Sequence, residues 1–247
     1  MLEREKILSL AESDAPLLLF EEIDSTNDHA KELIRRGEAV HGSLVLSDFQ
    51  SAGRGRHGHD FYSPKGSGLY LTILLDQDRK ETELPTIAAG VAVQRAIKEC
   101  CGRECGIKWV NDLFYNGKKV CGILAEALQA EHSWIIIGIG INCTDQAFPP
   151  EIADIAGSLD ISEEDRSKLA GLLWKELNRA VSLPKEELLP EYREASLLLG
   201  KEITFRENDV LYSGKAMAID DEGRLLVETE EGIRVLDSGE VSVRSWQ

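Results

Sequence analysis

Two short segments of the 247-residue chain carry cationic side chains in settings that suit the binding of an anion. Residues 53–58 read GRGRHG, so Arg54 and Arg56 lie between glycines that let the backbone close tightly on a ligand. Residues 108–112 read KWVND and place Lys108 in an apolar, strand-like context, where a charged lysine usually has a partner or a task. Together the two segments predict an anion-binding site.

The glycine segment has other interpretations, which its surroundings disfavour. It matches the G-x-G-x-x-G pattern of dinucleotide-binding turns, but Pro64, Gly66 and Gly68 follow and the chain then enters an apolar strand rather than a helix. The phosphate-binding pattern G-x-x-x-x-G-K-[ST] does not occur. A single Arg-Gly copy without interleaved aromatic residues also differs from RNA-binding segments. A solvated surface loop remains the plain alternative.

Composition limits the class of protein. Lys and Arg number 28 against 44 Asp and Glu, which gives a formal net charge of −16. Such a chain repels nucleic acid and anionic membranes alike, so we expect neither as a partner. The longest apolar stretches, such as 134–141, are far shorter than the ~20 residues of a membrane helix. At 43% apolar and 29% charged residues, the sequence is typical of a globular protein with a substantial core.

The five cysteines and the N-terminal sequence favour a reducing, cytoplasmic location. The first residues show no basic segment followed by an apolar one, so no signal peptide is predicted. An odd number of cysteines without an export signal indicates reduced thiols. Three of them, Cys100, Cys101 and Cys105, form no C-x-x-C pair, and His57 with His59 lacks a third ligand. We therefore predict no protein-held metal.

Strands and helices alternate in an order that places the glycine segment in a loop between two strands and Lys108 at a strand end. Residues 24–27 supply capping oxygens before a helix that carries Ala30, Leu33 and Ile34 on one face. Asn116-Gly117 is a strong two-residue hairpin signal, so neighbouring strands are expected to be antiparallel. Strands are predicted at 17–22, 43–49, 68–75, 106–110, 113–115, 118–128 and 133–142, and further helices at 84–99, around 169–180 and on to about 199.

The C-terminal part has a different pattern. From Lys201 onward short strands alternate with turns at 220–223 and 230–232, as in a small all-β module of roughly 45 residues. A mixed sheet with helices followed by such a module predicts an α+β protein with two domains, residues 1–199 and 200–247. The glycines of 138–142 (GIGIN) indicate either a plain buried strand or a strand that another group approaches closely.

Taken together, the motifs resemble those of biotin protein ligases. Any one is weak, but their order and spacing over about 120 residues are specific. The motifs are IDSTN at 23–27, QSAGRGRHG at 50–58, SP-x-G-x-GLY at 63–70, KW-x-ND at 108–112, GIL-x-E at 122–126 and GIGIN at 138–142. The resemblance implies a class II synthetase-like catalytic domain with a mixed, mainly antiparallel sheet, followed by a small SH3-like β-barrel.

The resemblance also implies an ATP-dependent ligase with two half-reactions. The biotin carboxylate attacks the α-phosphate of ATP, with Mg²⁺ accompanying ATP, and gives biotinyl-5′-AMP and pyrophosphate. A lysine of a biotin carboxyl carrier domain then attacks the anhydride. Like charges at ~4 Å cost roughly 4 kcal/mol per pair at an effective dielectric of about 20, and Arg54, Arg56 and Lys108 are the groups that would offset this cost.

Individual roles follow from the same resemblance. The predicted catalytic residues are Lys108, Arg54 and Arg56. The predicted biotin-binding residues are Ser25, Thr26, Asn27, Gln50, Gly53, Arg54, Gly55, Arg56 and Lys108. The predicted nucleotide-binding residues are Arg54, Arg56, Phe61, Lys108, Asn111 and Asn142. Lys118 and Lys119, after the hairpin turn, are most simply interpreted as solvated, and Asp112 as a structural turn residue.

The sequence departs from the family at four positions. His57 and His59 stand where the family usually has arginine, Phe61 where it has tryptophan and Val110 where it has proline. Loss of two fixed charges suggests that activity rises as the pH falls toward 6, where histidine becomes cationic. Only about 16 residues precede the first predicted strand, too few for the helix-turn-helix domain of the repressor members, so a monofunctional ligase is expected.

Two other functions remain open from the sequence. Lipoate or octanoate transfer enzymes share a related fold, although the Gly-Arg-Gly-Arg loop favours biotin. A non-catalytic sensor of biotin or a nucleotide is the other alternative, and the cationic side chains weigh against it, because a sensor need not stabilise charge that appears only during a reaction. A homodimer formed through a sheet edge is compatible with the resemblance.

Overall fold

The computed structural model describes residues 2–79, 82–145, 147–208, 210–239 and 241–243. Its helices are α1 (Arg4–Ala11), α2 (Thr26–Arg35), α3 (Pro85–Cys101), α4 (Glu163–Val181) and α5 (Lys185–Glu194), with 3-10 turns η1 (Arg56–Gly58) and η2 (Gln77–Arg79). The strands are β1 (Leu17–Phe20), β2 (Leu44–Ser47), β3 (Gly68–Asp76), β4 (Gly106–Lys108), β5 (Asp112–Tyr115), β6 (Lys118–Gln129), β7 (Ser133–Asn142), β8 (Glu202–Glu207), β9 (Val210–Ile219), β10 (Leu225–Thr229), β11 (Gly232–Leu236) and β12 (Val241–Val243).

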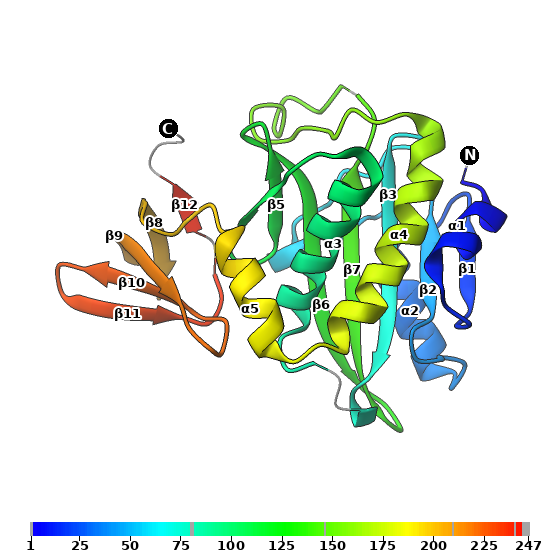
Figure 1. Cartoon of the computed structure of the whole chain (residues 1–247), viewed down its shortest axis with the longest axis horizontal. Helices are drawn as coiled ribbons and strands as arrows, with labels where there is room; N and C mark the ends of the chain where they lie inside the picture. The colour runs from blue at the N-terminus through cyan, green and yellow to red at the C-terminus, as the bar shows by residue number, and fades with distance from the viewer. Residues whose placement is uncertain (1, 80–81, 146, 209, 240, 244–247) are drawn as a thin grey trace.

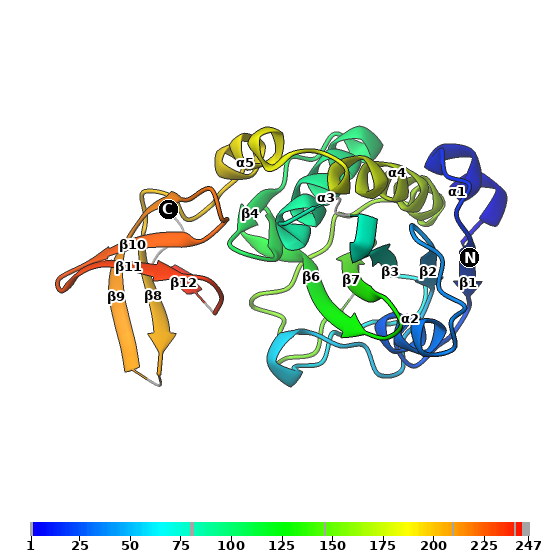
Figure 2. The same cartoon turned by 90° about the horizontal axis from the view of Figure 1, so that it is seen from below.

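The larger sheet has seven strands in the order β1-β2-β3-β7-β6-β5-β4. β1 and β2 are parallel and the other neighbours are antiparallel, so the predicted mixed, mainly antiparallel sheet is confirmed. Helices α1, α3, α4 and α5 lie along one face of this sheet, whereas α2 lies on the other (Figures 1 and 2).

Strand alternation produces this layering. On β2, Leu44 and Leu46 belong to the main core beneath α3 and α4, while Val45 belongs to a smaller core with Ala30 and Ile34 of α2. Because successive side chains of a strand point to opposite faces, both faces of the sheet bury apolar surface and both must be covered by helices. The segment between β2 and β3, which carries the glycine motif, crosses the α2 face (Figure 2).

The second sheet is antiparallel, with the strand order β11-β10-β9-β8-β12. The predicted α+β fold is thereby confirmed. The hairpin between β5 and β6 is also confirmed, because Asn116 and Gly117 both have positive φ (49° and 74°), as such two-residue turns require. In the part of the chain that the structure describes, no helix is long and apolar enough to cross a membrane.

The prediction that the last helix runs to about Leu199 is wrong, since α5 ends at Glu194. The backbone after it pairs with β4 instead: the Ile107 amide donates to Ala195 O at 2.7 Å, and the Leu197 amide donates to Ile107 O at 2.8 Å. Helical continuation would remove both bonds. The chain between α5 and β8 therefore extends the edge of the large sheet.

Candidate active site

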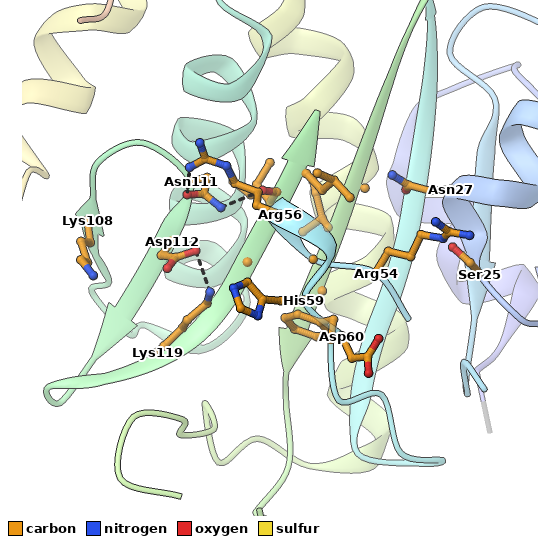
Figure 3. A pocket seen from close by; sticks show the side chains of 18 of the residues that line it. Ser25, Asn27, Arg54, Arg56, His59, Asp60, Lys108, Asn111, Asp112 and Lys119 are labelled. Atoms are coloured by element: carbon orange, nitrogen blue, oxygen red, sulfur yellow. Dashed lines mark hydrogen bonds and ion pairs between the residues drawn. The ribbon is translucent and has the colours of Figure 1, made fainter. Parts of the chain in front are cut away.

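A cavity of about 320 Å³ lies on the α2 face, between the glycine loop and the sheet (Figure 3). It is lined from α2, the β2–β3 segment, the β4–β5 turn, β6, β7 and the region of β12. Of the sequence-predicted residues, those that line it are Ser25, Thr26, Asn27, Gln50, Arg54, Gly55, Arg56, Phe61, Lys108 and Asn111. The predicted residues Gly53 and Asn142 are not among the lining residues.

One end of the cavity is a network of neutral polar groups at the start of α2. Gln50 Oε1 accepts from the Thr26 amide at 2.9 Å and from Thr26 Oγ1 at 3.0 Å, and Gln50 Nε2 donates to Ser63 Oγ at 3.1 Å. Thr72 Oγ1 lies between Thr26 Oγ1 (2.8 Å) and Asn27 Oδ1 (2.6 Å). Ser25, Thr26 and Asn27 are buried. This end can therefore orient a neutral ligand group that both donates and accepts hydrogen bonds.

Glu126 on β6 fixes the orientation of the Asn27 amide. Asn27 Nδ2 donates to Glu126 Oε2 at 2.8 Å, and Lys31 Nζ donates to Glu126 Oε1 at 2.8 Å. Burial acts to raise the pKa of Glu126, but the hydrogen bonds from Lys31 and Asn27 and the charges of Lys31 and Arg54 outweigh it, and the pKa is lowered. The carboxylate is thus held ionised, and Asn27 Oδ1 faces Thr72.

The other end of the cavity is cationic. Arg56 Nη1 donates to Asn111 Oδ1 at 2.9 Å, and Asn111 Nδ2 donates to Ile123 O at 2.9 Å, so the glycine loop is joined to the β4–β5 turn and to β6. Arg54 lies nearer the polar end, with its Nε 2.7 Å from Asp28 Oδ2 (Figure 3). Its side chain is 58% exposed, which places it at the rim.

Lys119 contributes a further cation that the sequence interpretation missed. The prediction that Lys119 is solvated is wrong: its side chain lines the cavity, and Nζ lies 2.8 Å from Asp112 Oδ1 (Figure 3). The cause is a β-bulge, because the register of β5 and β6 shifts between Leu113 and Phe114. In a strand without a bulge, Lys119 would point to the same face as Cys121, which is buried. A lysine at such a buried position is unfavourable, and this conflict in the sequence could have indicated that Lys119 points to the other face.

Lys108 and Lys119 have different surroundings. Lys108 ends β4 and lines the cavity, with its Nζ 5.9 Å from the centre of the Phe114 ring. In Figure 3 it lies apart from Arg56, whereas Lys119 points toward Asp112 beside His59. Lys118, the other lysine of the hairpin, donates to the carbonyls of Ala153 and Asp154 and lies outside the cavity lining.

Glycines form the floor of the cavity where side chains approach the backbone. A Cβ at Gly138 would collide with the Asn27 amide, and one at Gly140 would collide with the Phe61 ring. The ring also lies over Gly122, where a Cβ would be 3.2 Å from Phe61 Cε2. The interpretation of GIGIN as a strand that another group approaches closely is confirmed, and the approaching groups are Asn27 and Phe61.

The two predicted residues that do not line the cavity have structural partners. Asn142 is buried and its Nδ2 donates to Gly157 O at 2.9 Å. Gly53 has no room for a side chain, because a Cβ would lie 2.5 Å from Ser63 Oγ and 2.6 Å from Phe61 O. Among the cavity residues, His59 and Asp60 also come from the glycine loop, whereas the His57 side chain lies outside the described residues.

Among the described residues, no group of three or more His, Cys, Asp or Glu side chains is arranged to hold a metal ion. Of the nearby carboxylates, Asp48 is buried against Arg166 Nη1 at 2.5 Å, and Asp112 is paired with Lys119. Mg²⁺ accompanying ATP therefore stays a prediction.

Known proteins similar to this chain include biotin protein ligases. Residues 19–142 match the biotin/lipoate A/B protein ligase family, and residues 198–244 match the biotin protein ligase C-terminal domain. The bifunctional ligase/repressor BirA of Bacillus subtilis is 36% identical over 241 residues, covering 92% of this chain and 74% of that protein. A biotin–[acetyl-CoA-carboxylase] ligase of Mycobacterium tuberculosis is 29% identical, covering 88% of this chain and 85% of that protein.

Similarity to a solved structure extends over nearly the whole of both chains. The biotin protein ligase from Aquifex aeolicus in complex with biotin and ATP superposes with a TM-score of 0.80 and 31% identity, covering 94% of this chain and 99% of that one. The chain belongs to the biotin/lipoate protein ligase family. Within that family it is a biotin protein ligase, and the lipoate alternative is not favoured.

Proposed function

We propose that the cavity binds biotin with its ring at the polar end and its carboxylate at the cationic end, beside the phosphates of ATP. Thr26, Asn27 and Gln50 supply donors and acceptors suited to a ureido group. Arg54, Arg56 and Lys119 supply positive charge around the carboxylate and the α-phosphate. The observation that carries the proposal is that one cavity holds both ends. These are the polar network around Thr26, and the cations Arg56, hydrogen-bonded to Asn111, and Lys119, ion-paired with Asp112.

The first step joins a biotin carboxylate oxygen to the α-phosphorus and breaks the bond from that phosphorus to the bridging oxygen, so pyrophosphate leaves. Negative charge approaches negative charge, and the cations lower this cost most where the charge is greatest, in the transition state. When bound with ATP, Mg²⁺ would neutralise phosphate charge. Asn111 and Asp112 hold Arg56 and Lys119 in place before substrate arrives, which reduces the reorganisation needed during the reaction.

Lys108, the lysine predicted from the sequence, lines the same cavity and remains a candidate for contact with phosphate. We propose that Lys119 is the closer partner of the reacting atoms, because it stands beside Asp112 and the Phe61-covered floor. The predicted role of Asn142 toward adenine does not require the loss of its bond to Gly157, because that bond uses only one of the two Nδ2 hydrogens.

In the second step the amine of a carrier lysine forms an amide with the biotinyl carbon, AMP leaves with the anhydride oxygen, and the amine loses a proton. The named activity of the relatives on acetyl-CoA carboxylase supports a biotin carboxyl carrier domain as the acceptor. A net charge of −16 supports a partner other than nucleic acid. Five free cysteines, four of them buried, support a reducing cytoplasmic location.

A transfer assay tests this function. Purified protein, Mg-ATP, labelled biotin and an apo carrier domain are expected to give a biotinylated carrier, with no product when ATP is omitted or when the acceptor lysine is replaced by arginine. Lipoate in place of biotin serves as the competing substrate. Transfer of lipoate alone would contradict the proposal, and tight biotin binding without pyrophosphate release would identify a sensor.

Sedimentation of the same preparation tests the predicted homodimer, and limited proteolysis tests the proposed boundary between residues 199 and 200.

A further inference from the structure

Groups of other elements bind the β4–β5 turn, residues 109–111, of which Trp109 and Asn111 line the cavity. The Trp109 indole Nε1 donates to Gly223 O at 2.9 Å, in the turn between β9 and β10. The Tyr192 hydroxyl of α5 donates to Val110 O at 2.9 Å. Both side chains are almost fully buried, at 3% and 0% exposure. These hydrogen bonds leave neither the indole N–H nor the hydroxyl proton free for a ligand.

The turn and the first residue of β5 hold two of the four cationic side chains that line the cavity. Asn111, next after Val110, accepts from Arg56, and Asp112 pairs with Lys119. The connection therefore runs from Gly223 and Tyr192, through the turn backbone, to Arg56 and Lys119. A displacement of about 1 Å in such groups can reduce a rate by as much as ~10²-fold, because catalysis depends on their placement.

The second sheet and α5 are themselves fixed to each other at the same junction. Arg193 Nε donates to Ile219 O at 2.7 Å, and its Nη2 lies 2.8 Å from Asp221 Oδ1. Gly223 packs on α3, since a Cβ there would lie 2.5 Å from Ile87 Cδ1. In Figures 1 and 2, α5 runs beside the space between the two sheets. The 220–223 turn is thus docked against the catalytic part by bonds and by close packing.

We infer that Trp109 and Tyr192 are positioning residues for adenylate formation: they transmit the docking of the β9–β10 turn and of α5 to Arg56 and Lys119. The rate readout of this inference rests on the proposed function. Because such coupling is reciprocal, a change that weakens the contact of the 220–223 turn also weakens the positioning of Arg56 and Lys119. A ligand bound by Arg56 and Lys119 in turn stabilises the contact of the 220–223 turn.

Trp174 offers a matched control. It is also fully buried, and its Nε1 donates to a glycine carbonyl, Gly42 O, at the same 2.9 Å, but this bond lies beside β2 at the far end of the large sheet. Trp109→Phe and Trp174→Phe therefore remove the same donor and the same ring volume at two sites. Tyr192→Phe removes one hydroxyl and keeps the ring.

The experiment measures single-turnover adenylate formation at saturating biotin and ATP in the full chain, at a temperature where thermal melts show every variant folded. We expect Trp109→Phe and Tyr192→Phe to lower this rate by about tenfold or more, while Trp174→Phe stays within twofold of wild type. Rates within twofold of wild type for the first two variants, or an equal loss in Trp174→Phe, would overturn the inference.

Hydrogen exchange by mass spectrometry gives a readout that does not need activity. Trp109→Phe is expected to accelerate exchange in both 108–112 and 220–224, and Trp174→Phe to change neither. Acceleration in only one segment, or in neither, would contradict the coupling. A wild-type chain that forms no adenylate would contradict the proposed function, and the exchange result would still decide this inference.

Discussion

Arg56 Nη1 donates to Asn111 Oδ1 at 2.9 Å, although the two residues lie 55 positions apart in the chain. The bond joins the glycine loop to the β4–β5 turn, the two segments whose cationic residues first indicated a site. Asn111 is itself fixed, because Nδ2 donates to Ile123 O and its own carbonyl accepts from the Ile123 amide at 2.9 Å. Arg56 is therefore directed into the cavity by a side chain that is already anchored to β6.

Replacement of Arg56 tests its electrostatic role. Arg56→Ala is expected to slow adenylate formation by ~10²- to 10³-fold, the usual scale for loss of one preorganised donor. The control is Arg36→Ala, which removes an arginine whose side chain is 61% exposed at the end of α2, where it pairs with Glu32. Rapid-quench measurement at saturating substrates checks the rate. An Arg56 variant within threefold of wild type would refute the assigned role.

The two lysines can be ranked by the same assay. Lys119→Ala is expected to slow adenylate formation by ~10²-fold or more, and to do so more strongly than Lys108→Ala, because Lys119 is paired with Asp112 beside the cavity floor. Lys118→Ala, which changes the neighbouring lysine outside the lining, serves as the control and is expected to match wild type. A larger loss in Lys108→Ala would reverse the ranking.

Gly140 tests the packing of Phe61 on β7. In Gly140→Ala the new methyl group collides with the ring, so the free energy of unfolding is expected to fall by about 1–3 kcal/mol. Adding Phe61→Ala removes the collision, and the two substitutions should combine to less than the sum of their separate costs. Chemical denaturation of the four chains checks this. Strict additivity would show that the ring does not lie on Gly140 in solution.

The lowered pKa of Glu126 makes the free energy of unfolding depend on pH. Its pKa is lowered in the folded chain, so its contribution is present above the unfolded pKa of about 4.3 and is lost as the pH falls through the folded pKa. Glu126→Gln is expected to lower the melting temperature at pH 7, with a difference from wild type that shrinks below about pH 4. Glu32→Gln, at an exposed ion pair, is the control. A difference that persists unchanged in acid would contradict this assignment.

His59 carries the pH hypothesis drawn from the sequence. It lines the cavity beside Lys119 (Figure 3). That hypothesis, which the sequence placed on His57 and His59 together, expects adenylate formation to rise as the pH falls toward 6, and His59→Arg should weaken this dependence. Rates from pH 6 to 8.5, corrected for protonation of ATP, check this. A flat wild-type profile would end the hypothesis.

Local patterns predicted much of the fold, because they depend on neighbours in sequence. The Asn116-Gly117 turn and the Ser25 cap of α2 were found this way, and the Ser25 Oγ accepts from the Asp28 amide. The end of α5 was not, because the tertiary pairing of Ala195 and Leu197 with Ile107 overrides helical propensity. The place of Lys119 in the cavity was not predicted, because a β-bulge turns its side chain to the other face of the sheet and the alternating pattern of the sequence does not reveal the bulge.

The sequence predicted most of the residues that line the site, but not the hydrogen bonds and ion pairs that hold them. Ten of the twelve predicted residues line one cavity, since each sits in a motif with its own recognisable spacing. Their partners were not predicted, because Asp28, Glu126 and Asp112 meet Arg54, Asn27 and Lys119 only through the register of the sheet and the placement of α2.

We propose that this cavity joins biotin to the α-phosphate of ATP. Single-turnover mixing of the full chain with biotin and ATP labelled with ³²P at the α-position, followed by chromatography, tests it most directly. We expect label in biotinyl-5′-AMP that requires biotin and forms ~10²-fold or more slowly in Arg56→Ala. Label that stays in ATP with the wild-type chain, or an adenylate that forms equally well in Arg56→Ala, would contradict it.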